Sequence, residues 1–264
     1  MTELCHICSR KLKYQFTHKV LNKYDVDYFM CENCGFVQTE EPYWLKEAYQ
    51  ESINISDTGI MSRNIYLSKV TAILIYFLFE KNAKFLDFAG GYGIFTRLMR
   101  DIGFDFYWHD PFTPNLVARG FEYNKSIKDI ELITSFESFE HFVYPLKEIE
   151  KMLKISKNIL FSTELLPNPI PKPNEWWYYG LEHGQHISFY SLKTLKFTAK
   201  KYDLNFYSIG QVHLLTFKKF SSIILKILAK LNRVGLFTFV KGKIKSKTFE
   251  DMQKISISLG QRVK

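Results

Sequence analysis

The chain has 264 residues, of which 46% are hydrophobic and 17% aromatic, and its net charge is +9. This length accommodates one full α/β domain with a small additional module, and the apolar content excludes a chain that is disordered throughout. The longest apolar run, Val70–Phe79, has ten residues, whereas a membrane-spanning helix needs about 20. Because the first residues also lack the basic and apolar regions of a secretory signal, the sequence predicts a cytoplasmic protein.

The positive charge is concentrated toward the end of the chain. Residues 211–264 hold 12 of the 36 Lys and Arg residues and only two acidic residues, so residues 1–210 are close to neutral. A domain that binds nucleic acid is expected to have a clear basic face. The charge distribution therefore does not favour nucleic acid as the partner of the main domain.

All four cysteines lie near the N-terminus, in two CxxC pairs: Cys5, Cys8, Cys31 and Cys34. Two such pairs are typical of a tetrahedral structural Zn²⁺ site, in which four thiolates leave no position for a substrate. A disulfide is disfavoured in a cytoplasmic chain, and a redox centre needs only one pair. We therefore predict a small zinc-binding module over residues 1–42, which could hold nucleic acid, a protein or a neighbouring domain.

Beyond a connector and helix over residues 43–82, short apolar segments alternate with amphipathic ones, a pattern typical of a parallel sheet with crossover helices. We predict strands near residues 84–89, 104–109, 130–136, 157–163, 204–209 and 212–217, and helices near residues 61–80, 93–101, 144–154, 191–202 and 218–231. Only Gly210 and Gln211 separate the last two strands. These two strands must therefore pair antiparallel.

The first strand of this series runs into a glycine-rich turn that precedes a helix. The dinucleotide pattern GxGxxG is incomplete here, because Thr96 occupies the third glycine position. The pattern acidic-x-small-x-Gly-x-Gly is complete, in the residues Asp87, Ala89, Gly91 and Gly93. Such a turn lets the backbone approach a ligand near the helix N-terminus. Asp110 ends the next strand, where a carboxylate can accept hydrogen bonds from ribose hydroxyls.

These features, in this order, resemble class I S-adenosylmethionine-dependent methyltransferases over about residues 60–217. The segment Leu132–His141 also resembles the segment that follows the fourth strand in that family. The resemblance implies an α/β, Rossmann-like domain over residues 83–217, with a seven-stranded, mostly parallel sheet in the order 3-2-1-4-5-7-6 and strand 7 antiparallel. It also implies that Phe136 flanks the cofactor S-adenosylmethionine and that the pair Glu140 and His141 borders the substrate cleft.

The loop after the fifth strand contains adjacent aromatic residues, Trp176–Tyr179. It belongs to the carboxyl edge of the sheet, where open α/β folds bind ligands. The rings could stack on a sugar or a base, or form a hydrophobic lid on the core. Imidazoles nearby suit the removal of a proton from a methyl acceptor. The candidate catalytic residues are His183, His186, Glu182 and His141.

The cysteine module, the methyltransferase core and the segment His186–Ser191 together resemble the C-methyltransferases of bacterial deoxysugar pathways. The resemblance implies that His186 is the base. Gln185 stands where that family has Glu, and His183 where it has Tyr, so carbon and oxygen methylation both remain open. The predicted substrate is a sugar nucleotide or a precursor of a surface glycan such as a capsule or O-antigen polysaccharide. An RNA base methyltransferase and a non-catalytic zinc-ribbon adapter are the alternatives.

Residues 218–264 are predicted to form a basic, amphipathic helical extension. Apolar residues of this extension share one helical face: Ile223, Ile224, Ile227, Leu228 and Leu231. Such a face can pack on its own domain or rest weakly on an anionic membrane.

Overall fold

The computed structural model describes residues 4–261, and these residues divide into two compact units. The first unit contains the residues up to Ile55 together with Ser135–Lys219. The second unit contains Ser56–Thr134 and the residues from Phe220 onward. In the part of the chain described, no helix is both long and apolar enough to cross a bilayer.

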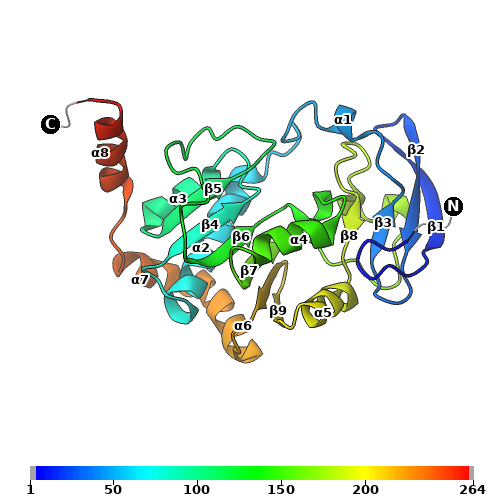
Figure 1. Ribbon diagram of the computed structural model, residues 1–264. Helices are drawn as coiled ribbons and strands as arrows, with labels where there is room; N and C mark the ends of the chain where they lie inside the picture. The colour runs from blue at the N-terminus through cyan, green and yellow to red at the C-terminus, as the bar shows by residue number, and fades with distance from the viewer. Residues whose placement is uncertain (1–3, 262–264) are drawn as a thin grey trace. The chain divides into compact units, whose positions relative to one another are not determined.

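In the first unit, the cysteine-containing segment belongs to a four-stranded antiparallel sheet with the order β1-β2-β3-β8 (Figure 1). Its strands are β1 (Lys13–Val20), β2 (Tyr24–Met30), β3 (Val37–Thr39) and β8 (Ser188–Phe189), and the short helix α1 (Leu45–Ala48) follows β3. In this sheet Val37 pairs with Phe189 and Gln38 with Ser188. A strand from late in the chain therefore completes the N-terminal sheet.

Aromatic rings of the loop before β8 form the core against this sheet. Trp176, Tyr178 and Tyr179 are 8%, 3% and 1% exposed, whereas Trp177 is 75% exposed. The ring of Tyr179 packs edge-on against Tyr28, with the ring centroids 5.7 Å apart. Three of the four aromatic residues predicted as a possible stacking surface are thus committed to hydrophobic packing.

Six strands form a mixed, mostly parallel sheet in the order β5-β4-β6-β7-β10-β9. They are β4 (Lys84–Phe88), β5 (Asp105–His109), β6 (Ile130–Ser135), β7 (Asn158–Ser162), β9 (Asn205–Ile209) and β10 (Val212–Thr216). Strand β4 pairs parallel with β5 and β6, and β10 pairs antiparallel with both β7 and β9. The predicted strands and the antiparallel final hairpin are confirmed close to their expected limits.

Helices connect these strands at the expected places. They are α2 (Ile60–Leu78), α3 (Ile94–Ile102), α4 (Pro145–Leu153) and α5 (Leu192–Lys201), with short 3₁₀ turns η1 (Phe139–His141), η2 (Pro173–Glu175) and η3 (Trp177–Tyr179). Local signals explain their ends. Pro145 begins α4 at a position where no backbone donor is needed, and Ser191 caps α5 by accepting a hydrogen bond from the Thr194 N–H.

The third strand of the predicted order 3-2-1-4-5-7-6 is not formed among residues 4–261, so this sheet has six strands instead of the predicted seven. The place of the third strand is taken by a single parallel bridge between Trp108 and Glu122. The Trp108 N–H donates to the Phe121 carbonyl (2.8 Å), and the Trp108 carbonyl accepts from the Tyr123 N–H (2.7 Å). The remaining strands follow the predicted order.

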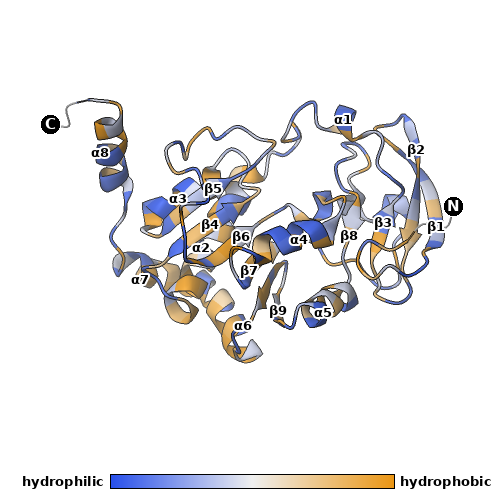
Figure 2. Ribbon diagram, viewed as in Figure 1, coloured by the Kyte–Doolittle hydropathy of each residue, from blue (hydrophilic) through white to orange (hydrophobic). Residues whose placement is uncertain are grey.

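The end of the chain forms three helices in the second unit: α6 (Ser222–Leu231), α7 (Leu236–Gly242) and α8 (Thr248–Ser258), with the 3₁₀ turn η4 (Asn232–Val234). Leu225 is the buried residue of α6. The residues of its predicted apolar face with the largest exposure are Ile223 (70%), Ile224 (52%), Ile227 (49%) and Leu231 (38%). Figure 2 shows hydrophobic residues along α6. Most of this apolar face is therefore open to its surroundings.

Candidate active site

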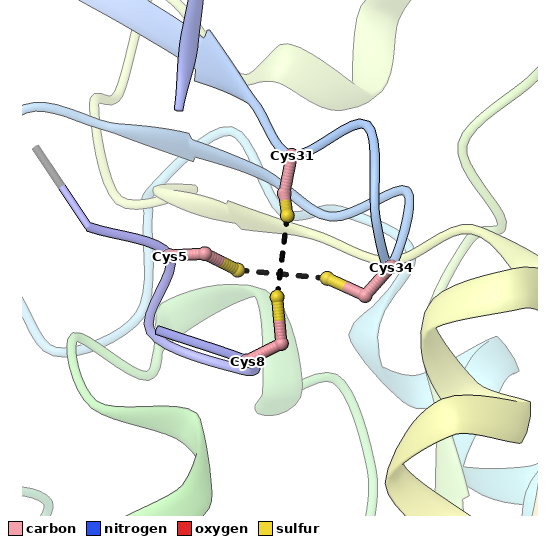
Figure 3. Close-up of side chains that lie close together, drawn as sticks. All are labelled: Cys5, Cys8, Cys31 and Cys34. Carbon is pink, nitrogen blue, oxygen red and sulfur yellow. Dashed lines mark hydrogen bonds between the residues drawn. The ribbon is translucent and has the colours of Figure 1, made fainter. Parts of the chain in front are cut away.

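The four cysteine side chains converge on one point (Figure 3). The Sγ atoms of Cys5 and Cys34 are 3.5 Å apart, those of Cys8 and Cys31 are 3.3 Å apart, and all four lie within 4.8 Å of one another. None is in a disulfide. Zn–S bonds of about 2.3 Å in a tetrahedron place sulfur atoms about 3.8 Å apart. The four thiols therefore have the chemistry and the spacing of a tetrahedral zinc site.

The second cysteine knuckle is supported by the start of α5, from the other half of the chain. The Thr194 hydroxyl donates to the Cys34 carbonyl at 3.0 Å. Gly35 has φ +74°, and a Cβ on it would lie 2.6 Å from the Ser191 Oγ. Only glycine fits this turn, because any side chain would be strained by the backbone and would displace the cap of α5.

The glycine-rich turn between β4 and α3 also allows close backbone approach. Gly93 caps α3 with φ +85°, and a Cβ on it would lie 2.7 Å from the Asn115 Oδ1. A Cβ on Gly90 would lie 2.7 Å from the Trp108 Cδ1. The first N–H groups of α3 have no acceptor within the helix. This turn therefore has the form of a polar-ligand site at a helix N-terminus.

Asp87 is the buried anchor of this turn. Its side chain is 2% exposed, and it accepts hydrogen bonds from the Thr96 hydroxyl (2.9 Å) on α3 and the Thr134 hydroxyl (3.1 Å) on β6. Burial raises the pKa of Asp87 to about 7, although both hydroxyl bonds oppose that rise. Asp87 thus holds the start of α3 against the sheet.

Ala89, the small residue of the predicted pattern, has a left-handed backbone with φ +59°. For a residue with a Cβ, this conformation costs roughly 1–2 kcal/mol. Replacing Ala89 with glycine is therefore expected to raise the free energy of unfolding by about 1 kcal/mol, because the relief of strain exceeds the added entropy of the unfolded chain. Urea denaturation measures the change.

Ala72→Gly, in the middle of α2, is the matched control for this substitution. It is expected to lower the free energy of unfolding by about 1 kcal/mol, because glycine disfavours a helix interior. A destabilised Ala89→Gly variant would contradict the assignment of strain to Ala89.

Asp110 and Gly91, both predicted to bind the cofactor, are in direct contact. The Gly91 N–H donates to the Asp110 Oδ2 at 2.9 Å, and the Trp108 Nε1–H donates to the Gly91 carbonyl at 2.8 Å. The other Asp110 oxygen accepts from the N–H groups of Phe112 (2.8 Å) and Thr113 (2.9 Å). These bonds fix the carboxylate at the end of β5. Trp108 had not been predicted as part of this site.

In the first unit, three of the four predicted catalytic residues come together. The ring centroid of His186 lies 4.9 Å from that of His141 and 4.7 Å from that of His183. His141 ends η1, six residues after the last residue of β6, and the other two come from the loop between η3 and β8. Phe136 directly follows β6. We call His141, His183 and His186 the imidazole cluster.

Backbone groups determine which nitrogen of each ring carries a proton. The Nδ1 of His186 lies 2.7 Å from the Tyr178 carbonyl, which can only accept, so Nδ1 is protonated and Nε2 has the lone pair. The Nδ1 of His183 accepts from the Gln185 N–H at 3.1 Å, so neutral His183 is protonated at Nε2. His141 resembles His186, because its Nδ1 lies 3.1 Å from the Gln185 carbonyl.

Two imidazoles of the cluster, His141 and His186, are neutral at ordinary pH. Burial, and then the interaction with His183, lowers the pKa of His141 to about 4. The pKa of His186 is held well below its ordinary value by burial and then by His141 and His183. His186 therefore offers an unprotonated Nε2 to a ligand.

Glu182, the fourth predicted residue, is exposed. The Nδ1–H of His186 is held by a backbone carbonyl and not by Glu182. The buried carboxyl group beside the cluster belongs instead to Glu140, which is 1% exposed. Burial, and then the charge of Glu137, raises the pKa of Glu140 to about 8. In the sequence, the position of Glu140 directly before His141 was the one indication that it belongs to this site.

Tyr49 also reaches the cluster, and its hydroxyl lies 2.9 Å from the Nδ1 of His141. Gln185 donates from its side chain to the Ala48 carbonyl at 2.8 Å, next to Tyr49. No sequence pattern had marked Tyr49, because it lies 92 positions from His141 within the connector.

A family model described as a methyltransferase domain matches residues 63–209, which is more than half of the chain. No curated protein sequence matches it.

Several solved structures are similar at low identity. The plantazolicin methyltransferase BpumL in complex with SAH is 10% identical, with 76% of this chain and 89% of that chain covered and a TM-score of 0.48. An O-methyltransferase family protein from Burkholderia thailandensis is 15% identical, with 65% and 61% covered and a TM-score of 0.46. For OxaC in complex with sinefungin and meleagrin the identity is 16%, the coverage 52% and 42%, and the TM-score 0.39. The chain thus spans less than half of OxaC.

Proposed function

The chain belongs to the family of methyltransferase domains, and we propose that it methylates a sugar nucleotide or a surface-glycan precursor at carbon or oxygen, with a histidine as general base. The enzyme is an S-adenosylmethionine-dependent methyltransferase. The observation that supports a base most directly is the tautomer of His186, whose Nδ1–H is held by the Tyr178 carbonyl.

The residues of the glycine-rich turn fit the cofactor. Backbone at Gly91 and Gly93 would approach its polar groups, and the Asp110 carboxylate would accept from ribose hydroxyls. Asp87 and Ala89 would support the conformation of the turn. Phe136 is proposed to flank the cofactor. When bound, S-adenosylmethionine supplies a methyl group on a positively charged sulfur.

In the proposed reaction, the imidazole cluster removes the proton from the acceptor. Displacement at the methyl group needs an acceptor atom that is positioned and has lost its proton. His186 Nε2 is proposed to take that proton, while the protonated Nε2 of His183 donates to a neighbouring oxygen of the acceptor. His141, the third member of the imidazole cluster, packs against His186. For Glu182, a role at the surface near the acceptor stays a prediction.

Calorimetry tests the acceptor class. S-adenosylhomocysteine is titrated first, and nucleotide-linked 4-keto sugars are then titrated into the preformed complex. Saturable binding of a sugar nucleotide is expected. Cofactor binding without sugar binding would contradict the proposed substrate and direct the search to glycan polymers or RNA. Folded, zinc-loaded protein that does not bind the cofactor would favour the non-catalytic adapter.

We propose that residues 1–42 form a structural zinc module, with Cys5, Cys8, Cys31 and Cys34 as the ligands. Replacing Cys34, whose thiol is buried, with serine is expected to remove one equivalent of zinc and to destabilise the four-stranded sheet. Structural zinc contributes about 10–16 kcal/mol of binding free energy in small domains, so the effect on folding should be large. Metal analysis after dialysis and thermal denaturation measure the two changes.

The control for the cysteine variant is His18→Asn, on β1. It is expected to retain zinc and stability. A Cys34→Ser variant with a full complement of zinc would refute the assignment.

The exposed face of α6 is proposed to contact an anionic membrane surface weakly. Ile223 and Ile227 are 70% and 49% exposed, and Lys226 and Lys230 are exposed on the same helix. Apolar residues flanked by lysines are typical of interfacial helices. Co-sedimentation with phosphatidylglycerol vesicles, compared with phosphatidylcholine vesicles, is expected to show selective binding that Ile223→Ser with Ile227→Ser abolishes. Equal partitioning into both vesicles would exclude the contact.

A further inference from the structure

Two histidines of the imidazole cluster and the neighbouring Glu140 bring three potential metal ligands close together. The ligand atoms offered by Glu140, His141 and His186 all lie within 4.8 Å of one another. Within residues 4–261, the Oε2 of Glu140 is buried and has no hydrogen-bond partner. A buried carboxyl oxygen without a hydrogen-bond partner is costly. This group of atoms is therefore incomplete as it stands.

The two imidazoles are oriented as metal-binding histidines usually are. Their hydrogen bonds to residues that the structure describes involve Nδ1. His186 donates to the Tyr178 carbonyl (2.7 Å), and the Nδ1 of His141 contacts the Gln185 carbonyl (3.1 Å) and the Tyr49 hydroxyl (2.9 Å). Backbone carbonyls on Nδ1 fix the ring and leave the Nε2 lone pair for an ion.

The carboxylate is held in a similar way. The hydroxyls of Tyr178 and Thr163 favour the ionised form of Glu140 and lower its pKa, against the larger effect of burial, and these two hydroxyls lie 3.2 Å apart. They orient the carboxyl group, while its Oε2 remains without a partner among the residues that the structure describes. Each of the three side chains is thus fixed by a second group.

We propose that Glu140, His141 and His186 bind a divalent transition-metal ion such as Zn²⁺. Two imidazoles and one carboxylate are a donor set that such ions prefer over Mg²⁺ or Ca²⁺, which favour oxygen ligands. The ion satisfies the Glu140 oxygen and both lone pairs at once. This site is distinct from the four cysteines, because it uses nitrogen and oxygen ligands from η1 and from the loop before β8.

Binding of the ion should also affect methyl transfer, an inference that rests on the proposed function. Coordination takes the lone pair of His186 that would accept the proton of the acceptor. We therefore expect the bound ion to inhibit methyl transfer reversibly.

The test counts metal rather than activity. Wild-type protein, Glu140→Gln, His141→Asn and the control His18→Asn are each equilibrated with Zn²⁺, dialysed and analysed for metal per chain. Wild-type protein and His18→Asn are expected to hold one equivalent more than Glu140→Gln and His141→Asn. The site is tested by the difference in metal content between variants. Because all of these variants keep the four cysteines, zinc bound there does not change the difference. Circular dichroism shows which variants fold, and either of the two cluster variants suffices.

Equal metal content in wild-type protein and a folded cluster variant would overturn the site. A lost equivalent in either variant supports it. Methyl transfer is then assayed with and without the extra equivalent of Zn²⁺. Binding without inhibition would leave the metal site standing and would overturn the role of His186 as base, so failures of the two proposals are distinguishable.

Discussion

Replacing His186 with asparagine is expected to lower kcat for methyl transfer by about 10²–10⁴-fold, the usual contribution of a positioned proton acceptor. The asparagine amide can still donate to the Tyr178 carbonyl, which His186 Nδ1 contacts at 2.7 Å. The fold of the loop should therefore persist while the lone pair of Nε2 is lost. Steady-state kinetics with the best sugar-nucleotide acceptor measure the effect.

Two measurements separate this result from a general loss of structure. The affinity for S-adenosylhomocysteine should be unchanged in His186→Asn, since the glycine-rich turn carries the proposed cofactor contacts. His18→Asn makes the same chemical change on β1 and should keep wild-type kcat. A His186→Asn variant within a factor of two or so of wild-type kcat would show that His186 does not accept the proton.

Replacing Asp251 with alanine is expected to lower the free energy of unfolding by about 3–5 kcal/mol, because it leaves a buried arginine without its main partner. Asp251 and Arg100 are each 3% exposed. The Arg100 Nη2 and Nε donate to the two Asp251 oxygens at 2.6 and 2.8 Å, and Arg97 adds a third bond at 2.7 Å. The guanidinium also lies 3.7 Å from the centroid of the Phe121 ring.

Urea denaturation of Asp251→Ala beside Glu250→Gln tests this expectation. Glu250 neighbours Asp251 but its side chain is 75% exposed, so its substitution should change stability by no more than about 0.5 kcal/mol. Equal stabilities of the two variants would contradict the expectation.

The same pair makes stability depend on acid. Burial alone would raise the pKa of Asp251, but bonds from Arg100 and Arg97 outweigh it and hold the pKa below the ordinary value of an aspartate. The stabilisation is therefore present above the ordinary aspartate pKa and is lost as the pH falls through the lowered pKa of the folded protein. Asp251, one of the few acidic residues of the basic C-terminal segment, thus anchors α8 to α3 through its bonds to Arg100 and Arg97.

Much of the fold was readable from local patterns in the sequence. Short apolar runs and amphipathic periods depend on neighbours in the chain, which is why the strands from β4 to β10 begin and end near their predicted limits. The glycine turn at Gly91 and Gly93 was readable for the same reason, since positive φ angles select glycine locally. The two CxxC pairs brought four thiols together as their spacing predicted.

The third strand failed because pairing needs more than a local apolar residue. Phe121 and Tyr123 flank the single bridge between Trp108 and Glu122, and each makes one backbone hydrogen bond to Trp108. The sequence predicted the apolar face of α6 correctly. It did not predict which residue of the helix is buried, and in the structure that residue is Leu225.

The sequence by itself determined the residue types of the candidate site, and the tertiary structure decided their states. His141 and His186 were readable as imidazoles, but the protonated nitrogen of each is set by carbonyls of Gln185 and Tyr178. Glu140 became a buried carboxyl group, and Tyr49 joined His141 from 92 positions away. Arg100 and Asp251 met across 151 positions. Such contacts follow from packing between distant segments, which no local pattern encodes.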